Sequence, residues 1–98
     1  MIDEMADLRR RIDLLDEHLI RLLNARAACA REIGQLKEAL GLPIYQPDRE
    51  REVLDHVRSV NTGPLDDGAI GRLFERIIDE ARRLERMAQM GRRTTGMR

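Results

Sequence analysis

Aromatic side chains are almost missing from the sequence. Of its 98 residues only Tyr45 and Phe74 are aromatic, and none is tryptophan. The chain therefore offers no row of rings on which nucleic-acid bases could stack. Its 18 basic and 18 acidic side chains cancel to a formal net charge of zero, whereas proteins that bind nucleic acid electrostatically are markedly basic. Nucleic acid is not an expected partner.

Cysteine and long apolar runs are scarce as well. Cys29 is the only cysteine, so no disulfide can form within the chain, which fits a reducing cytoplasm. No stretch approaches the ~18 consecutive apolar residues that a transmembrane helix needs, and the N-terminus carries acids where a secretory signal begins with basic residues. His18 and His56 follow no metal-ligand spacing. We expect a cytoplasmic protein that uses no metal or cofactor and no membrane.

Glycine and proline divide the sequence into three predicted helices, one long and two shorter. The first spans residues 3–40 and ends at Gly41, which Pro43 follows closely. The second begins with Pro47, a residue suited to a first helical position, and ends near residues 61–63. The fold class is therefore all-α.

The third predicted helix begins after Asp66, whose side chain can cap the first turn, while Leu65 can pack on Ile70. It is expected to end at Gly91. Residues 1–91 then form one domain. The side chains expected to face inward from the two shorter helices are Leu54, Val57, Val60, Phe74, Ile77, Ile78, Ala81 and Leu84.

A basic tail, residues 92–98, follows the third helix. We expect it to be disordered, because a basic end of this kind is far more often solvated than a binding site.

An apolar stripe runs the length of the first helix. A stripe that repeats at alternating steps of three and four is typical of a seam that packs on other helices. A straight helix of this length would be roughly 57 Å long, whereas a compact chain of this size has a radius of gyration of about 13 Å. We therefore expect a second copy of the chain to complete the core. The stripe consists of Met5, Leu8, Ile12, Leu15, Leu19, Leu22, Cys29, Ile33, Leu36 and Leu40.

The alternative is a kink that folds the first helix into two antiparallel pieces. Residues 25–28 contain no glycine or proline that would produce one, so a continuous helix is favoured.

Two cations stand on the apolar face of the first helix. Neither Arg26 nor Lys37 has an acid three or four residues away, where a helical ion pair would form. The two are eleven residues apart, which is three turns plus roughly 20°, so they share a face. Such charges must pair across helices or bind a ligand, and we expect that removing either one leaves the fold intact. The alternative is that Arg26 pairs with a structural glutamate and Lys37 reaches water.

Two acids complement these cations. Glu85 follows Ile78 by seven residues and so points along the buried stripe of the third helix, although it could instead lie at the edge and pair with Arg82. Glu50 opens the second helix beside Arg49, where an acid could simply stabilise the helix N-terminus. Together with the two cations, these acids are expected to face one interior between the three helices.

Several segments resemble the all-helical chorismate mutases. Residues 8–16 (LRRRIDLLD), 22–26 (LLNAR) and 33–37 (IGQLK) are similar to the first helix of that family. Residues 43–52 (PIYQPDRERE) resemble its loop and second-helix start, and residues 73–78 (LFERII) its third helix. The similarity covers most of the chain, with the motifs in the order and spacing of the family.

The resemblance implies an intertwined homodimer that converts chorismate to prephenate without a cofactor, in phenylalanine and tyrosine biosynthesis. Arg26 matches the arginine that binds a substrate carboxylate, and Arg9 matches one contributed by the other subunit. Lys37 matches the lysine that binds the ether oxygen and a carboxylate. Glu50 matches the acid that accepts from the ring hydroxyl, and Arg49 the arginine beside it.

The sequence departs from the family at three positions. Gln46 stands where some relatives have an aspartate whose backbone meets the hydroxyl, so that contact could survive. Ala81 replaces a serine that contacts a carboxylate in some relatives, so that side-chain contact is lost. Glu85 stands where bacterial relatives often have a glutamine that donates to the ether oxygen, although other branches use glutamate.

The implied reaction suits these residues. A Claisen rearrangement needs no nucleophile or metal, so catalysis must come from holding a flexible dianion folded and from donors at the ether oxygen. Isochorismate pyruvate lyase, which shares the fold and a similar pocket, and a non-catalytic helical dimerisation module are the alternatives. Family members also occur joined to prephenate dehydratase, prephenate dehydrogenase or the first enzyme of the shikimate route, so a fusion or regulatory partner stays open.

Overall fold

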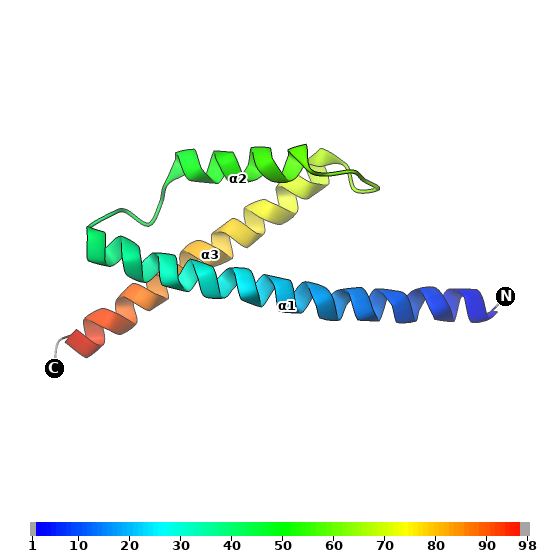
Figure 1. Ribbon diagram of the computed structural model, residues 1–98, viewed down its shortest axis with the longest axis horizontal. Coiled ribbons are helices and arrows are strands. Elements are labelled where there is room, and N and C mark those ends of the chain that lie inside the picture. The colour runs from blue at the N-terminus through cyan, green and yellow to red at the C-terminus, as the bar shows by residue number, and fades with distance from the viewer. Residues whose placement is uncertain (1, 97–98) are drawn as a thin grey trace.

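Residues 2–96 fold into three α-helices joined by two short connections. The computed structural model describes the backbone of residues 2–96 and the side chains of residues 3–91. Within that range the elements are α1 (Ile2–Leu40), α2 (Pro47–Ser59) and α3 (Asp67–Gly96), with no strand. The second half of α1 crosses α3, and α2 returns to the beginning of α3 (Figure 1). The predicted all-α class is confirmed, with one long and two shorter helices.

The end of α1 is set by Gly41, as predicted. This glycine has φ +68°, a left-handed conformation that costs other residues more. The Leu42 N–H donates to the Lys37 carbonyl at 2.8 Å, and the Gly41 N–H donates to the Glu38 carbonyl at 3.2 Å. This pair of hydrogen bonds is a Schellman motif, which satisfies carbonyls that the helix end leaves open.

Helix α2 begins with Pro47 at its first position, as predicted, and ends at Ser59. Leu54 and Val57 are half-buried. The prediction that Val60 faces inward is wrong, since its side chain is 60% exposed. Val60 is the residue that follows the helix, so helical periodicity no longer sets the direction of its side chain.

Helix α3 is capped by Asp66, whose Oδ1 accepts the Ala69 N–H at 2.7 Å. The predicted end at Gly91 is wrong, because the helix continues to Gly96. A glycine ends a helix most readily in the left-handed conformation, which Gly91 does not adopt. Inside a helix a glycine costs only about 1 kcal/mol relative to alanine. The first five residues of the predicted tail are therefore helical, and residues 97–98 lie outside the described range.

The core of the single chain is small. Among the described side chains, Ala30 and Ile78 are the only buried apolar ones, and the other inward residues predicted on α3 are half-buried. The radius of gyration is 17.7 Å and the longest dimension 63 Å, against the 13 Å or so of a compact chain. An elongated shape of this kind leaves much apolar surface in water.

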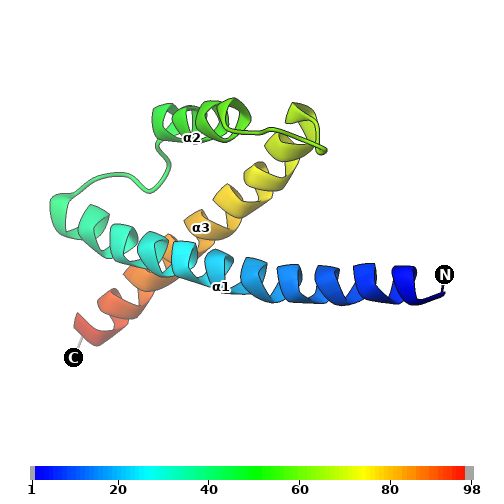
Figure 2. The ribbon, with the colours of Figure 1, turned by 45° about the vertical axis from the view of Figure 1, so that its right-hand side comes forward.

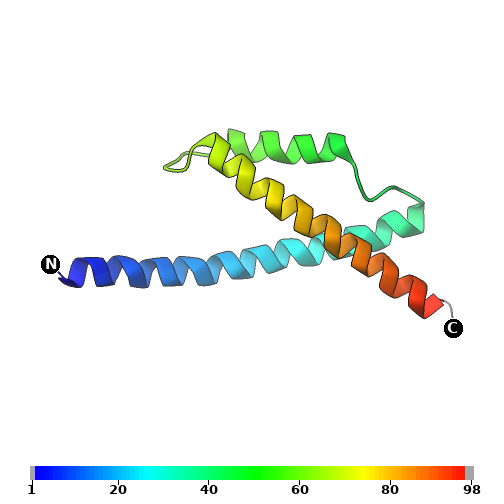
Figure 3. The same cartoon turned by 180° about the vertical axis from the view of Figure 1, so that it is seen from behind.

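Helix α1 is continuous over 39 residues, so the kinked alternative is wrong. Its first half extends away from α2 and α3, as the views from two further directions also show (Figures 2 and 3). Except for Cys29, which is also exposed, the stripe side chains are 45–69% exposed. A seam this long and exposed is typical of a surface that packs against another chain.

Candidate active site

A cleft of about 300 Å³ lies where the second half of α1, the connection before α2, the first turns of α2 and the middle of α3 approach one another. Both polar and apolar side chains form its walls. Seven of the eight residues that the sequence singled out for the site line this cleft, and Arg9 does not. The seven are Arg26, Lys37, Gln46, Arg49, Glu50, Ala81 and Glu85.

A mostly buried ion pair between α1 and α3 lines the cleft. The Lys37 Nζ lies 3.0 and 3.2 Å from the two carboxylate oxygens of Glu85 and donates also to the Ile44 carbonyl at 2.7 Å. The two charged side chains are only 13% and 8% exposed. Lys37 therefore pairs across helices instead of reaching water, and the alternative in which Glu85 pairs with Arg82 is wrong. Both charged groups are therefore largely shielded from water.

A close helix crossing places this ion pair. A Cβ atom added to Gly34 would lie 2.7 Å from the Glu85 Cα, so the two backbones meet where α1 has no side chain. The buried amide of Gln89 donates to the Gly34 carbonyl at 3.2 Å, one turn further along α3. Lys37 follows Gly34 by three residues and so lies on the same face of α1. The crossing thereby brings its ammonium group onto Glu85.

Arg26 is the cation of the cleft that no acid neutralises. It is half-buried, and no side chain or backbone group in the described part of the chain gives it a hydrogen bond or an ion pair. The alternative in which Arg26 pairs with a structural glutamate is therefore wrong for the single chain. A guanidinium has five donors in a planar fork that matches a carboxylate. An anionic ligand would satisfy it.

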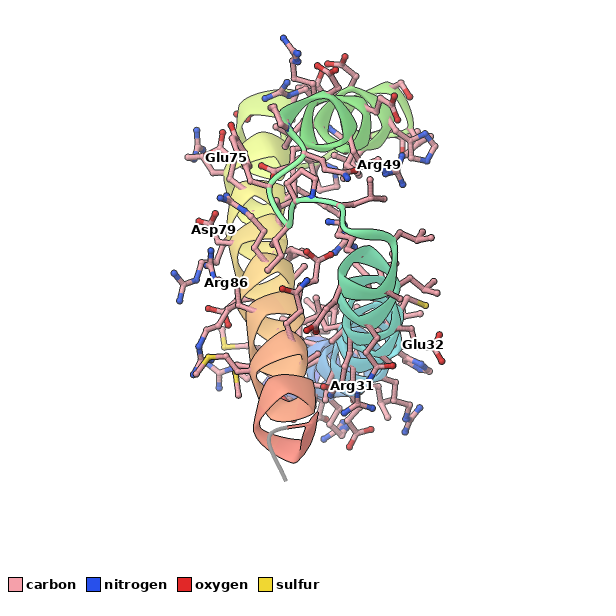
Figure 4. The ribbon with its side chains drawn as sticks, turned by 90° about the vertical axis from the view of Figure 1, so that its left-hand side faces the viewer. Arg31, Glu32, Arg49, Glu75, Asp79 and Arg86 are labelled. Atoms are coloured by element: carbon pink, nitrogen blue, oxygen red, sulfur yellow. The ribbon has the colours of Figure 1, made fainter. Side chains whose placement is uncertain are left out.

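The opposite wall comes from the beginning of α2. Glu50 lies in the first turn of α2, which suits an acid, and it also makes an ion pair with Arg82 of α3, with 3.2 Å between the carboxylate oxygen and Nε. Arg49 makes an exposed ion pair with Glu52 and extends from α2 on the side facing α1 (Figure 4). Gln46 precedes the helix and adds an amide to the cleft.

Arg82 is a cleft residue that sequence reasoning missed. It directly follows Ala81 on α3 and precedes Glu85 by three residues, and this spacing was the one available signal. Its Cζ also lies 5.3 Å from the centre of the Tyr45 ring, a contact that depends on the path of the connection before α2. Helical spacing alone does not reveal such a contact.

Arg9 is exposed and lies outside the cleft of its own chain. It precedes Arg26 by seventeen residues, or roughly 25 Å along α1. An arginine side chain does not span that distance.

The described part of the chain shows neither a metal site nor a membrane span. Residues 3–91 hold no group of three or more His, Cys, Asp or Glu side chains that could bind a metal ion. No described helix is both long and apolar enough to cross a bilayer.

A second groove, of about 370 Å³, lies on the other side of Arg26. It is bordered by apolar side chains of α1 and α3, and Arg26 and Ala81 line both this groove and the cleft. Its other residues are Leu23, Asn24, Ala27, Arg76, Ile77, Glu80 and Leu84.

The fold and the cleft define an all-helical protein with an exposed helical seam and a small pocket in which cations outnumber acids. Residues 8–86 match the family described as chorismate mutase type II. The chain belongs to this family.

Individual relatives agree with the family match. The chain is 42% identical over 88 residues to the bifunctional chorismate mutase/prephenate dehydratase of Pseudomonas aeruginosa, a match that covers 85% of this chain and 24% of that protein. It is 30% identical to the chorismate mutase of Methanocaldococcus jannaschii, with 88% of each covered. A solved chorismate mutase from Helicobacter pylori, in complex with prephenate, matches with a TM-score of 0.81 at 28% identity, covering 88% of this chain and 93% of that one. The chain thus spans about a quarter of the bifunctional relative and most of the other two.

Proposed function

We propose that the chain catalyses the Claisen rearrangement of chorismate to prephenate, a step of phenylalanine and tyrosine biosynthesis in the cytoplasm. The observation that carries the proposal is the convergence of unpaired Arg26 and the Lys37–Glu85 pair in one cleft of the chorismate mutase fold. Chorismate is a dianion with an ether oxygen, so it needs one group that binds a carboxylate and another that donates to the ether.

Binding would restrict the conformation of the substrate. Arg26 holds one carboxylate through its planar fork, and Arg49 adds positive charge from the wall opposite. With both ends held, the two reacting carbons stay close, and the entropy cost of folding the substrate is met on binding instead of in the transition state.

Charge stabilisation would act at the ether oxygen, where negative charge develops as the carbon–oxygen bond breaks. Lys37 is fixed in place by Glu85 and the Ile44 carbonyl before any ligand binds. A donor that is already positioned needs no reorganisation during the reaction and is worth more in a dry site than in water. Glu85 lies beside it as a second group facing the ether oxygen.

Recognition of the ring hydroxyl would fall to the beginning of α2. In this proposal Glu50 accepts the hydroxyl hydrogen, and the backbone at Gln46, which also borders the cleft, makes a second contact with the hydroxyl. Ala81 leaves an apolar spot on the α3 wall, where the side chain forms no hydrogen bond with the substrate.

The active form is proposed to be a homodimer with shared sites. The support is the exposed seam along α1, together with the distance that separates Arg9 from the cleft of its own chain. Arg9 of a second copy would add a further cation to the bound dianion. In this arrangement each cleft is complete only in the dimer.

The test is direct. Purified protein is given chorismate, and separately isochorismate, while prephenate, salicylate and pyruvate are followed. We expect prephenate from chorismate without added metal or cofactor. Salicylate and pyruvate from isochorismate would instead identify a pyruvate lyase. If neither compound is converted, the chain is a non-catalytic helical dimerisation module.

A further inference from the structure

One side chain of the cleft joins three parts of the fold. Arg82 of α3 makes an ion pair with Glu50 in the first turn of α2 and donates to Asp79 of its own helix at 2.5 Å. Its guanidinium also lies over the ring of Tyr45, 5.3 Å from the ring centre, in the connection before α2. A planar, delocalised cation suits both roles at once, because it can stack on a ring while its edge faces a carboxylate.

This position matters because α2 has few attachments. In the described part of the chain the backbone of α2 lies close to that of α3 and not to that of α1. Of the ion pairs formed by residues 3–91, that between Arg82 and Glu50 is the one that joins α2 to α3. Both groups are largely shielded, with 28% and 22% of their side chains exposed, so water screens the pair less than a surface pair.

The contact leaves Glu50 able to bind a ligand. The Arg82 Nε faces the carboxylate at 3.2 Å but makes no hydrogen bond in the described part of the chain. A carboxylate has about four acceptor positions. The charge of Arg82 therefore fixes where Glu50 lies without using up the positions that a hydroxyl donor would occupy.

We propose that Arg82 is a positioning residue, which clamps Glu50 and the Tyr45 connection so that the α2 wall of the cleft is set before the substrate binds. The inference rests on the function proposed for the same cleft, because Glu50 is there the acceptor of the substrate hydroxyl. Arg82 acts through Glu50 and does not itself touch the substrate.

The kinetic test is a double-mutant cycle. Arg82→Met keeps the apolar stem and removes the guanidinium, and we expect kcat/KM to fall by about 10-fold, as for coupled neighbouring residues. Arg82→Lys keeps the charge but not the planar fork, and should recover part of the loss. In a Glu50→Gln background, Arg82→Met should change kcat/KM by less than about 2-fold, because the carboxylate that Arg82 positions is then already absent. The matched control is Arg83→Met, whose partner Glu80 lies outside the cleft, and it should keep normal kinetics.

Two kinetic outcomes would overturn the inference. If the Arg82→Met and Glu50→Gln losses simply multiply, Arg82 acts independently of Glu50, either on the substrate itself or on the fold. If Arg82→Met has normal kinetics while the wild-type protein is active, the clamp has no role in catalysis.

A second measurement does not depend on activity. Tyr45 is the only tyrosine and the chain has no tryptophan, so tyrosine fluorescence reports on the connection alone. Removing the guanidinium above the ring should increase quenching by acrylamide in Arg82→Met and leave it unchanged in Arg83→Met. Equal quenching in all proteins would refute the clamp. A wild-type protein without mutase activity would refute the proposed function instead, and the fluorescence result would still decide whether Arg82 holds the connection.

Discussion

Lys37 and Glu85 face each other across the crossing of α1 and α3, with the ammonium nitrogen 3.0 and 3.2 Å from the two carboxylate oxygens. Each is the nearest counter-charge of the other in a mostly buried position. This relationship changes one expectation drawn from the sequence. Lys37 has no acid three or four residues away on α1, yet removing it would leave the carboxylate of Glu85 without its counter-charge. The two cleft cations, Lys37 and Arg26, should therefore respond differently to substitution.

Arg26→Ala should lower kcat/KM by at least ~10²-fold, the scale for losing one preorganised charge-stabilising group. Its thermal unfolding should be nearly unchanged, because no acid in the described part of the chain loses its partner. Steady-state kinetics and a melting curve decide this. Near-normal turnover in a well-folded variant would remove Arg26 from the substrate site.

Lys37→Ala should be inactive and also less stable, by about 3–5 kcal/mol, the usual effect of leaving one member of a buried ion pair alone. The double variant Lys37→Met with Glu85→Leu removes both charges and should regain the lost stability, since apolar replacement of a buried pair is often neutral or stabilising. It should stay inactive. Denaturant unfolding of the three proteins tests this, and a double variant as unstable as Lys37→Ala would contradict it.

Glu85→Gln should lower both stability and activity. A glutamine amide has nearly the shape of the carboxylate but no charge, so the mostly buried ammonium group of Lys37 would lose its counter-charge. Lys37 would then be held less firmly for its role at the ether oxygen, and kcat/KM should fall. Denaturant unfolding and steady-state kinetics test this, and a variant as stable and as active as the wild type would show that the charge of Glu85 is not needed.

Subunit mixing tests the shared site. Arg9→Ala and Arg26→Ala should each be inactive as homodimers, because every cleft then lacks one cation. After exchange of subunits, a heterodimer would hold one intact cleft out of two, and activity should return. Exchange itself is followed with a size tag on one variant. If exchange is complete and activity does not return, Arg9 does not act across the dimer.

The crossing should not tolerate a methyl group. Gly34→Ala would place a carbon 2.7 Å from the Glu85 Cα, and since both atoms belong to backbone-anchored positions, the helices must move apart. We expect a loss of about 1–3 kcal/mol, typical of overpacking, together with a lower kcat. Gly91→Ala is the matched control, because nothing lies within 4 Å of a Cβ added there, and it should stabilise α3 by up to about 1 kcal/mol. Equal stability of the two variants would contradict the close approach.

The length and course of the first helix could be predicted from the sequence because they depend on the regular spacing of apolar residues. The repeat of Leu8, Ile12, Leu15 and Leu19 predicts a straight helix that outgrows a single chain, and Gly41 marks its end. The same reasoning failed where local conformation is not periodic. Gly91 was expected to stop α3, but a glycine stops a helix only if the chain beyond it turns away.

The charges of the cleft were predictable for a related reason. Arg26 and Lys37 interrupt an apolar face, and a buried charge requires a partner. The sequence offered a Lys37–Glu85 ion pair as one possibility but did not decide for it, because the pairing depends on the approach of α1 to α3 at Gly34. The role of Arg82 was hidden for a similar reason, since its position on Tyr45 and Glu50 depends on the path of the connection between helices.

Arg26 borders both the cleft and the groove behind it, and this dual position has a thermodynamic consequence. A chain that packs into the groove contacts the same Arg26 guanidinium that would bind an anion in the cleft. Packing in the groove and anion binding in the cleft therefore both depend on the rotamer of Arg26. If packing of a second copy favours the rotamer that binds the anion, the anion must strengthen the packing by the same factor, because linkage is reciprocal. Affinity for the substrate would then decrease on dilution, and substrate would shift the monomer–dimer equilibrium toward the dimer.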